Sequence, residues 1–248
     1  AASDVYKRQT YTATAGFGFL ITPTTRLTLD GLYRDYSADD TEQTDRQTRS
    51  LSVGAAHEVG TGLTLNGSIG YQEIETEKTD LFGYRGTERL TGVIGSLGAT
   101  QELTNGTVGI SFDQSQNTAG SRSTLRVSRA MDLPSGSLAL SLGASRGDSG
   151  KTTAVGSINY DHALENGSLS ARLSQSVSTN SDDEEVEARN LLLRLSHDLT
   201  PVSGVSLSVS YADLNNLQDS GGDRTRSQIR AAYSHDLTQD WELSGSYE

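Results

Sequence analysis

A hairpin pattern recurs along the whole chain, and all four histidines fall at the same place in it. Each histidine precedes a turn signal by a few residues, and the turn signal precedes a strand in which apolar and polar residues alternate. Three further segments, Phe19–Ile21, Gln101–Leu103 and Met131–Leu133, occupy this place with other residues. The chain therefore contains seven copies of one hairpin. An array of amphipathic hairpins with no helix between them is typical of a transmembrane β-barrel.

Alternation is clearest in residues 63–71, where Leu, Gly, Ile and Tyr hold the odd positions and Thr, Asn, Ser and Gly the even ones. Residues 205–211 and 241–247 alternate in the same way. Successive side chains of a strand point to opposite faces, so each segment predicts a strand with one apolar face.

The two ends of the predicted hairpins differ. Asn105-Gly106 and Asn166-Gly167 are typical of two-residue hairpin loops, because both residue types tolerate positive φ. The opposite ends carry longer, polar and acidic segments, at residues 37–46, 75–88, 178–187 and 214–225. This asymmetry predicts short periplasmic turns and longer extracellular loops.

The predicted fold is all-β, an antiparallel up-and-down transmembrane β-barrel with about fourteen strands of about ten residues each. If both termini of the parent are periplasmic, the intact barrel has sixteen or more strands. Residues 3–9 resemble an adapter-derived tail, so we expect residues 1–9 to be non-native. Residues 10–248 then form a partial outer-membrane barrel domain, a fragment of a longer protein.

Composition favours a barrel over a soluble sandwich, although a sandwich alternates too. Only 33% of the 248 residues are hydrophobic, which suits a sheet with one apolar face. The polar face is mostly Ser, Thr and Gly, and the only lysines are Lys7, Lys78 and Lys151. The net charge of −12 argues against a nucleic-acid partner, since no basic stripe is present. The chain has no cysteine and hence no disulfide framework.

Five aromatic residues each lie six positions after an early residue of their predicted strand. We expect them to form an aromatic girdle at the outer membrane interface. They are Tyr33, Tyr71, Phe112, Tyr211 and Tyr247.

The histidines admit two interpretations. They could bind a metal, or they could lie at the membrane interface as amphipathic rings near the turns. Equivalent positions on different hairpins lie around a ring and do not converge on one ion, so the pattern favours the interface and predicts no metal site. The residues are His57, His162, His197 and His235.

Two charged sets share the inward phase and are predicted to line a pore. An acidic residue follows the histidine position at Glu58, Glu102, Asp132, Asp198 and Asp236. These carboxylates either form a cation-attracting ring or are simply solvated at the pore rim. Arginines occupy the same face at Arg126, Arg172, Arg194 and Arg230.

With Asp30, Arg34 and Glu242, the arginines either create a transverse field across a lumen or pair with carboxylates between strands. Arg129 falls on the outward face near a turn, where a cation is expected only if it reaches the interface.

No catalytic constellation is visible. Neither a Ser/His/Asp set nor a glycine-rich phosphate loop stands in a strand–turn–helix context. The chain is therefore expected to be no enzyme and to need no cofactor.

Residues 33–36 (Tyr-Arg-Asp-Tyr) and 234–244 resemble the strand–turn–strand units of outer-membrane barrels of the β-barrel porin type. They are also similar to barrels associated with exopolysaccharide export and PEP-CTERM systems. The resemblance implies an outer-membrane location and passage of solute or polysaccharide, and it supplies no site residues.

The sequence thus predicts a porin-like passive channel in the outer membrane of a Gram-negative bacterium. Its expected partners are the lipid bilayer, lipopolysaccharide, and a solute or exopolysaccharide. Two alternatives stay open: a structural or export-associated barrel without an open pore, and a surface β-repeat adhesin.

Overall fold

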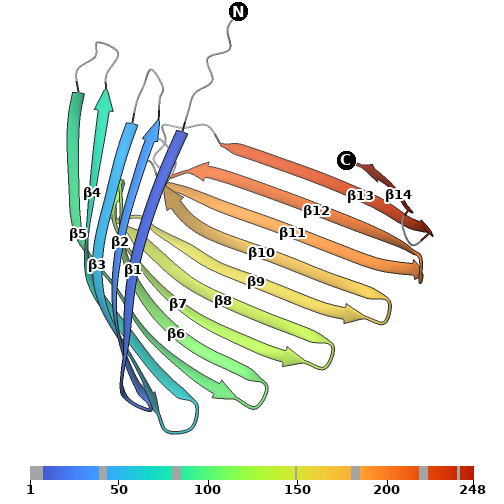
Figure 1. Cartoon of the computed structure of the whole chain (residues 1–248), viewed down its shortest axis with the longest axis horizontal. Coiled ribbons are helices and arrows are strands. Elements are labelled where there is room, and N and C mark those ends of the chain that lie inside the picture. The colour runs from blue at the N-terminus through green and yellow to red at the C-terminus, as the bar shows by residue number, and fades with distance from the viewer. Residues whose placement is uncertain are drawn as a thin grey trace, which may run out of the picture. The chain divides into compact units, whose positions relative to one another are not determined.

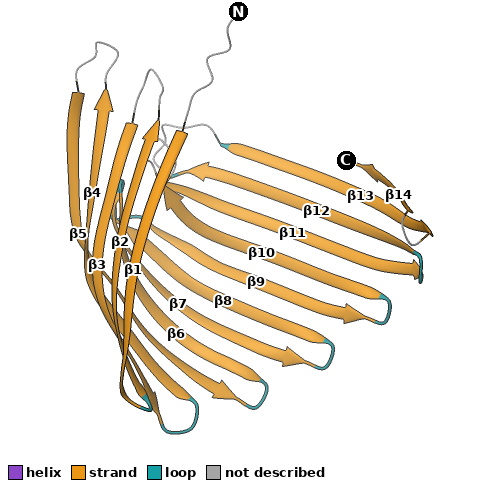
Figure 2. Cartoon of the chain, viewed as in Figure 1, coloured by secondary structure: helices purple, strands orange, loops and turns teal. Residues whose placement is uncertain are grey.

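The computed structural model describes residues 8–38, 44–79, 85–148, 150–179, 185–217, 223–238 and 241–248. These residues form fourteen strands, joined in sequence order into one antiparallel sheet (Figures 1 and 2). The strands are β1 (Arg8–Thr22), β2 (Thr25–Ala38), β3 (Thr44–Val59), β4 (Leu63–Thr79), β5 (Arg85–Leu103), β6 (Gly106–Asn117), β7 (Gly120–Leu133), β8 (Gly136–Gly147), β9 (Thr152–Leu164), β10 (Gly167–Thr179), β11 (Glu185–Thr200), β12 (Ser203–Asn216), β13 (Arg224–Thr238) and β14 (Trp241–Tyr247).

The predicted fold class is confirmed: the sheet is all-β, antiparallel and up-and-down, and β1 and β14 are its two edge strands. Among the described residues, no helix has the length and apolar character needed to span a membrane. The chain divides into two compact units. The first comprises residues 1–100, 111–124 and 146–151, and the second comprises residues 101–110, 125–145 and 152–248.

In the first unit, register places apolar residues opposite one another on one face of the sheet. Phe17 of β1 pairs with Leu29 of β2, which pairs with Val53 of β3, which pairs with Ile69 of β4. The opposite face carries small and polar side chains, such as Ser68 and Ser96, whose hydroxyls lie 2.8 Å apart. We call these two surfaces the apolar face and the polar face.

The second unit has the same two faces. Leu193 of β11 pairs with Ala171 of β10 and with Val209 of β12, and Val209 pairs with Ile229 of β13. Side chains alternate between the two faces along each strand. The paired residues of every second position therefore form a row of apolar side chains across the strands.

Within the ranges that the structure describes, no second layer of protein covers the apolar face. Among the described residues, only Ile74 and Val155 are buried hydrophobics. Large side chains of the apolar face remain open, with Ile69 67%, Leu142 72% and Ile229 61% exposed. A soluble β-sandwich would bury such residues between its sheets, so this architecture differs from a sandwich.

Within the described residues, short turns join the strands of the hairpins from β1–β2 to β11–β12 at one end, which we call the turn end. The loop residues were expected to be Asn105-Gly106 and Asn166-Gly167, and this expectation is wrong by one residue. The turns are formed by residues 104–105 and 165–166, and each glycine opens the next strand with positive φ, 122° at Gly106 and 154° at Gly167.

Each turn also contacts the hairpin that follows it. The Asp198 amide donates to the Asn166 carbonyl at 2.8 Å, and the Asp132 amide donates to the Asn105 carbonyl at 3.1 Å. A Cβ on Gly167 would lie only 2.1 Å from the Ser196 carbonyl oxygen. Glycine is therefore required there by close backbone approach as well as by φ.

Successive hairpins are staggered in one direction. Thr25 of β2 pairs with His57, and β3 continues two residues beyond it to Val59 before the next turn. Ser203 of β12 pairs with His235, and β13 continues three residues to Thr238. A shift of two to three residues per two strands, at ~3.3 Å per residue and ~4.8 Å between strands, corresponds to a tilt of roughly 35–45°.

Strand lengths differ from the expectation, and so do the connections at the end of the sheet opposite the turn end, which we call the far end. Apart from β14, the strands have 12 to 19 residues instead of about ten, because much of the polar far-end sequence continues the ladder. The connection between β6 and β7, from Asn117 to Gly120, is as short as the turns at the other end. Residues 1–7 of the predicted tail and parts of the predicted long loops lie outside the described residues.

Asp148 closes one far-end connection. It accepts hydrogen bonds from the Ser121 hydroxyl at 2.5 Å and from the Ser121 amide at 2.7 Å. The hydroxyl bond and then the amide bond favour the carboxylate, so they hold the pKa of Asp148 below its ordinary value. The contact ties the start of β7 to the residue that follows β8.

Candidate functional site

The polar face of β9–β13 is built largely of serine. On β12, Ser206, Ser208 and Ser210 project away from the face that carries Leu207 and Val209. Across the ladder, Ser206 pairs with Ser196 of β11 and with Ala232 of β13. Small hydroxyl side chains leave the backbone close to the surface and make this face hydrophilic.

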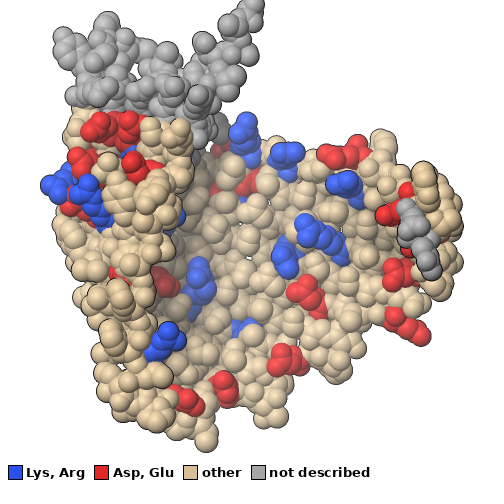
Figure 3. Space-filling view, viewed as in Figure 1, with Lys and Arg blue, Asp and Glu red and all other residues tan. Residues whose placement is uncertain are grey.

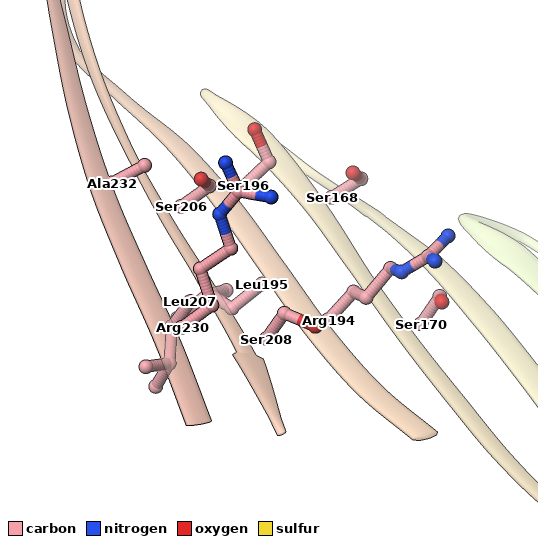
Figure 4. A pocket seen from close by; sticks show the side chains of 10 residues that line it. All are labelled: Ser168, Ser170, Arg194, Leu195, Ser196, Ser206, Leu207, Ser208, Arg230 and Ala232. Atoms are coloured by element: carbon pink, nitrogen blue, oxygen red, sulfur yellow. The ribbon is translucent and has the colours of Figure 1, made fainter. Parts of the chain in front are cut away.

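Two of the four predicted arginines meet on this face. Arg194 of β11 and Arg230 of β13 both pair with Ser208, one from each side, and Arg194 also pairs with Ser170 of β10. They border a hollow of about 470 Å³, whose other polar lining is Ser168, Ser170, Ser196, Ser206 and Ser208. In Figure 4 the Arg194 side chain extends toward Ser170, and that of Arg230 extends toward Ser196 and Ser206.

Neither arginine is neutralised by a carboxylate within the described part of the chain. Asp161 lies two strands from Arg194 in the same row, opposite Ser170, and forms no ion pair with it. Glu248 accepts a hydrogen bond from Gln228 Nε2 at 2.6 Å. The two guanidinium groups therefore face the hollow without a counterion from these strands.

The other two predicted arginines also lie on the polar face, but they do not line the hollow. Arg172 pairs with Leu192 of β11 and Asn159 of β9. Arg126 lies on β7 beside Gly143 of β8. A Cβ on Gly143 would crowd the backbone of Arg126, so glycine makes room for it.

Sequence reasoning missed Arg224 and Arg226, which continue the same face of β13 toward the far end, opposite Leu214 and Ala212. Counting alternate positions back from Arg230 would have found them. Figure 3 shows basic side chains gathered in the middle of the face over β10–β13, with acidic ones toward the turn end.

Three of the predicted carboxylates lie near the turn end, in the phase of the polar face. Glu58 pairs with Thr64, Asp198 with Gly204 and Asp236 with Glu242. Backbone contacts explain why the chain at this position is fixed: the Glu58 amide donates to the Thr24 carbonyl at 2.9 Å and the Asp236 amide to the Val202 carbonyl at 2.8 Å. Glu102 and Asp132 hold the equivalent position near the ends of β5 and β7.

On the polar face, the charged side chains of β2 lie beside glycines of β1. Gly16 of β1 pairs with Asp30, and a Cβ there would lie 3.0 Å from the Asp30 carboxylate. A Cβ on Gly18 would lie 2.9 Å from the Arg26 guanidinium. Arg34, also on this face, pairs with Thr12 and Thr48. Glycines on β1 thus make room for the charged side chains of β2.

All four histidines lie on the apolar face, two or three residues before the last residue of their strand. Thr25 Oγ1 lies 2.8 Å from His57 Nδ1. His162 stacks on Tyr160 with ring centroids 5.9 Å apart, and His235 stacks on Tyr233 at 6.4 Å. His197 pairs with Gly167 and Val205. Each ring thus has a neighbour on its own hairpin or the adjacent one.

The five aromatics lie on the apolar face but stand at two distances from the start of their strands. Tyr33, Tyr71 and Tyr211 stand eight residues after the first residue of their strands. Phe112 and Tyr247 stand six residues after it. Counted from the start of their own strands, the two groups therefore differ by two residues, which is about 7 Å along a strand.

Charged residues begin directly beyond this aromatic level. Arg189 pairs with Glu187 by an ion pair of 2.7 Å, and Arg89 pairs with Glu73 at 2.6 Å. The Arg49 guanidinium lies 5.9 Å from the centre of the Tyr33 ring. The apolar rows are thus bounded by charge at the far end.

Arg129, the residue that did not suit its outward position, has a partner at the turn end. Its Nη2 donates to Asn105 Oδ1 of the preceding turn at 2.6 Å.

Among the described residues, no three His, Cys, Asp or Glu side chains cluster closely enough to hold a metal ion.

No protein-family model matches this chain, and no curated protein matches it. Solved structures do. A mutant of the ferric enterobactin receptor PfeA from Pseudomonas aeruginosa matches with a TM-score of 0.69 at 12% identity, covering 98% of this chain and 51% of that one. The siderophore receptor PirA from Acinetobacter baumannii matches with a TM-score of 0.64 at 9% identity, covering 94% and 51%.

The FrpB iron transporter from Neisseria meningitidis matches with a TM-score of 0.63 at 9% identity, covering 93% of this chain and 48% of that one. The chain thus spans about half the length of these structures. The neighbours are bacterial outer-membrane β-barrels, which is the fold and the location that the sequence predicts. They are receptors and transporters, so the narrower resemblance to exopolysaccharide-associated barrels is not supported.

Proposed function

We propose that this chain forms part of the wall of a β-barrel in the outer membrane of a bacterium, and that solute passes along its polar face. The single observation that carries the proposal is the exposed apolar face, which has no covering layer among the described residues. Contiguous apolar surface of this extent is unfavourable in water and favourable against acyl chains.

The size of the apolar band supports a membrane partner. On β4 it runs from Leu63 to Tyr71, and on β11 from Leu191 to Leu199. Each run is nine residues long, which is the length that a tilted strand needs to cross the hydrocarbon layer. The stagger between hairpins supplies the matching tilt.

Orientation follows from the same rows. The short turns are assigned to the periplasm and the charged far ends to the cell surface, where Arg189 and Arg89 would meet the headgroups of lipopolysaccharide. Bilayer lipid and lipopolysaccharide are then the partners of the apolar face.

The experiment is reconstitution of the intact protein into liposomes. We expect recovery in the outer-membrane fraction, heat-modifiable migration on a gel, and entry of small sugars or ions into protein-containing vesicles. Recovery of a compact, detergent-independent monomer would contradict the membrane assignment. A folded barrel that admits no solute would contradict the transport assignment and leave a structural barrel.

A second candidate is a receptor-type transporter, which binds its solute before passage. The neighbours described above favour it, since they are siderophore receptors and an iron transporter. The two candidates differ in kinetics: a passive pore conducts in proportion to solute concentration, whereas a receptor shows saturable binding and little conductance as the purified protein.

A further inference from the structure

We propose that Arg194 and Arg230 form a binding site for the oxyanion group, a carboxylate or a phosphate, of a small organic solute. The proposal rests on the proposed function only in requiring that the polar face be open to solute. It adds a site, a pair of residues and a ligand class.

Placement of the two arginines suits one shared anion. They flank Ser208 on β11 and β13, so their Cα atoms lie about 10 Å apart, twice the spacing of neighbouring strands. Each guanidinium carries five donors in a planar fork that fits a carboxylate or a phosphate. The two side chains extend to different serines, Arg194 toward Ser170 and Arg230 toward Ser196 and Ser206, so both hold one anion only after a change of side-chain rotamer.

Charge around the pair favours an anion. The residues opposite Arg194 are Ser170 and Ser208, and Ser208 is also opposite Arg230. On the other side of Arg230 the register of β13 and β14 continues to Glu248, but this carboxylate accepts a hydrogen bond from Gln228 and forms no ion pair with Arg230. Ion pairs do occur elsewhere in this chain, at Arg89 and Arg189 on the apolar face. Arg172, Arg224 and Arg226 add positive charge to the same polar face, although the whole chain carries −12.

The lining selects a hydrophilic ligand. Serine hydroxyls can donate further hydrogen bonds to oxygen atoms of a ligand, and their small size keeps the hollow open. Its volume of about 470 Å³ lies within the range of small-molecule sites. A large apolar ligand would leave the guanidinium groups unpaired, which is costly.

The test is calorimetric titration of the intact, detergent-solubilised protein with inorganic pyrophosphate and, separately, with citrate. The double variant Arg194→Gln/Arg230→Gln should weaken binding by at least about tenfold, because charge-assisted hydrogen bonds are lost. The double variant Arg194→Lys/Arg230→Lys should bind with intermediate affinity, since it keeps the charge and loses the fork.

The matched control is Arg49→Gln/Arg89→Gln, which removes the same charge from the apolar face and should bind like the unsubstituted protein. Equal affinity of the control and the Arg194/Arg230 variant would overturn the site, as would absence of binding by the unsubstituted protein at millimolar ligand. Solute entry into liposomes is measured separately, so a protein that binds pyrophosphate but admits nothing would sink the proposed transport and keep the anion site.

Discussion

The backbone amide of Asp198 donates a hydrogen bond of 2.8 Å to the carbonyl oxygen of Asn166, and so joins the hairpin β11–β12 to the turn between β9 and β10. The Asp132 amide makes the same contact with Asn105, and that of Ala163 makes it with Ser135 at 2.7 Å. A chain of such contacts fixes the stagger of the hairpins, because each turn meets a set residue of the next hairpin.

Replacing Gly167 by alanine should break this contact. The added Cβ would lie 2.1 Å from the Ser196 carbonyl oxygen, so the turn must move away from β11. We expect a loss of about 1–3 kcal/mol in unfolding free energy, the usual cost of local backbone strain. The midpoint of urea unfolding in lipid vesicles measures it. Gly245→Ala is the control, since a Cβ there meets nothing within 4 Å, and equal midpoints for the two variants would refute the close approach.

Two residues of β12 should respond oppositely to a charge. Leu207 lies on the apolar face and Ser210 on the polar face, opposite Leu192 and Gln228. Leu207→Arg should destabilise the folded barrel in vesicles by about 2–4 kcal/mol, whereas Ser210→Arg should change its stability little. Refolding yield and urea midpoints report both. Similar losses for the two variants would contradict the assignment of one face to lipid and the other to water.

Low pH should loosen the connection at Asp148. Its folded-state pKa lies below the ordinary value, so its contribution to stability is present above the ordinary pKa of about 4 and is lost as pH falls through the lower, folded-state pKa. Hydrogen exchange of the Ser121 amide should accelerate under these conditions after correction for the intrinsic rate. Asp148→Asn should show fast exchange already at neutral pH, and an unchanged rate in this variant would count against the contact.

The contact between Arg129 and Asn105 should appear as a coupling energy. A double-mutant cycle of Arg129→Ala and Asn105→Ala should give about 0.5–1.5 kcal/mol, as for a hydrogen bond near the surface. Urea midpoints of the two single variants and the double variant supply it. Strict additivity would show that Arg129 acts without Asn105.

Alternation in the sequence was sufficient to predict the strands and their faces, because side-chain direction in a strand has a period of two. Arg194 and Arg230 were assigned to the polar face on this basis, and register places them there. Alternation cannot predict which residues pair, since a shift of two residues preserves both faces. The meeting of the two arginines at Ser208 therefore needed the register.

Strand ends were predicted less well for a related reason. Residues such as Glu75 and Arg189 are charged yet continue the ladder, because a strand beyond the membrane gains from backbone pairing whatever its side chains. The glycines after Asn105 and Asn166 were assigned to the turns on φ alone. Their place at the start of the next strand follows from contact with the neighbouring hairpin, which the sequence does not display.

The most direct test of the two-faced wall is spin labelling along β12 in reconstituted vesicles, one residue at a time from Val205 to Tyr211. The chain has no cysteine, so each introduced cysteine carries the only label. We predict that labels at Val205, Leu207, Val209 and Tyr211 collide with oxygen dissolved in the bilayer, and that labels at Ser206, Ser208 and Ser210 collide with a water-soluble nickel complex. Uniform accessibility to the nickel complex at all seven positions would contradict a lipid-facing apolar side.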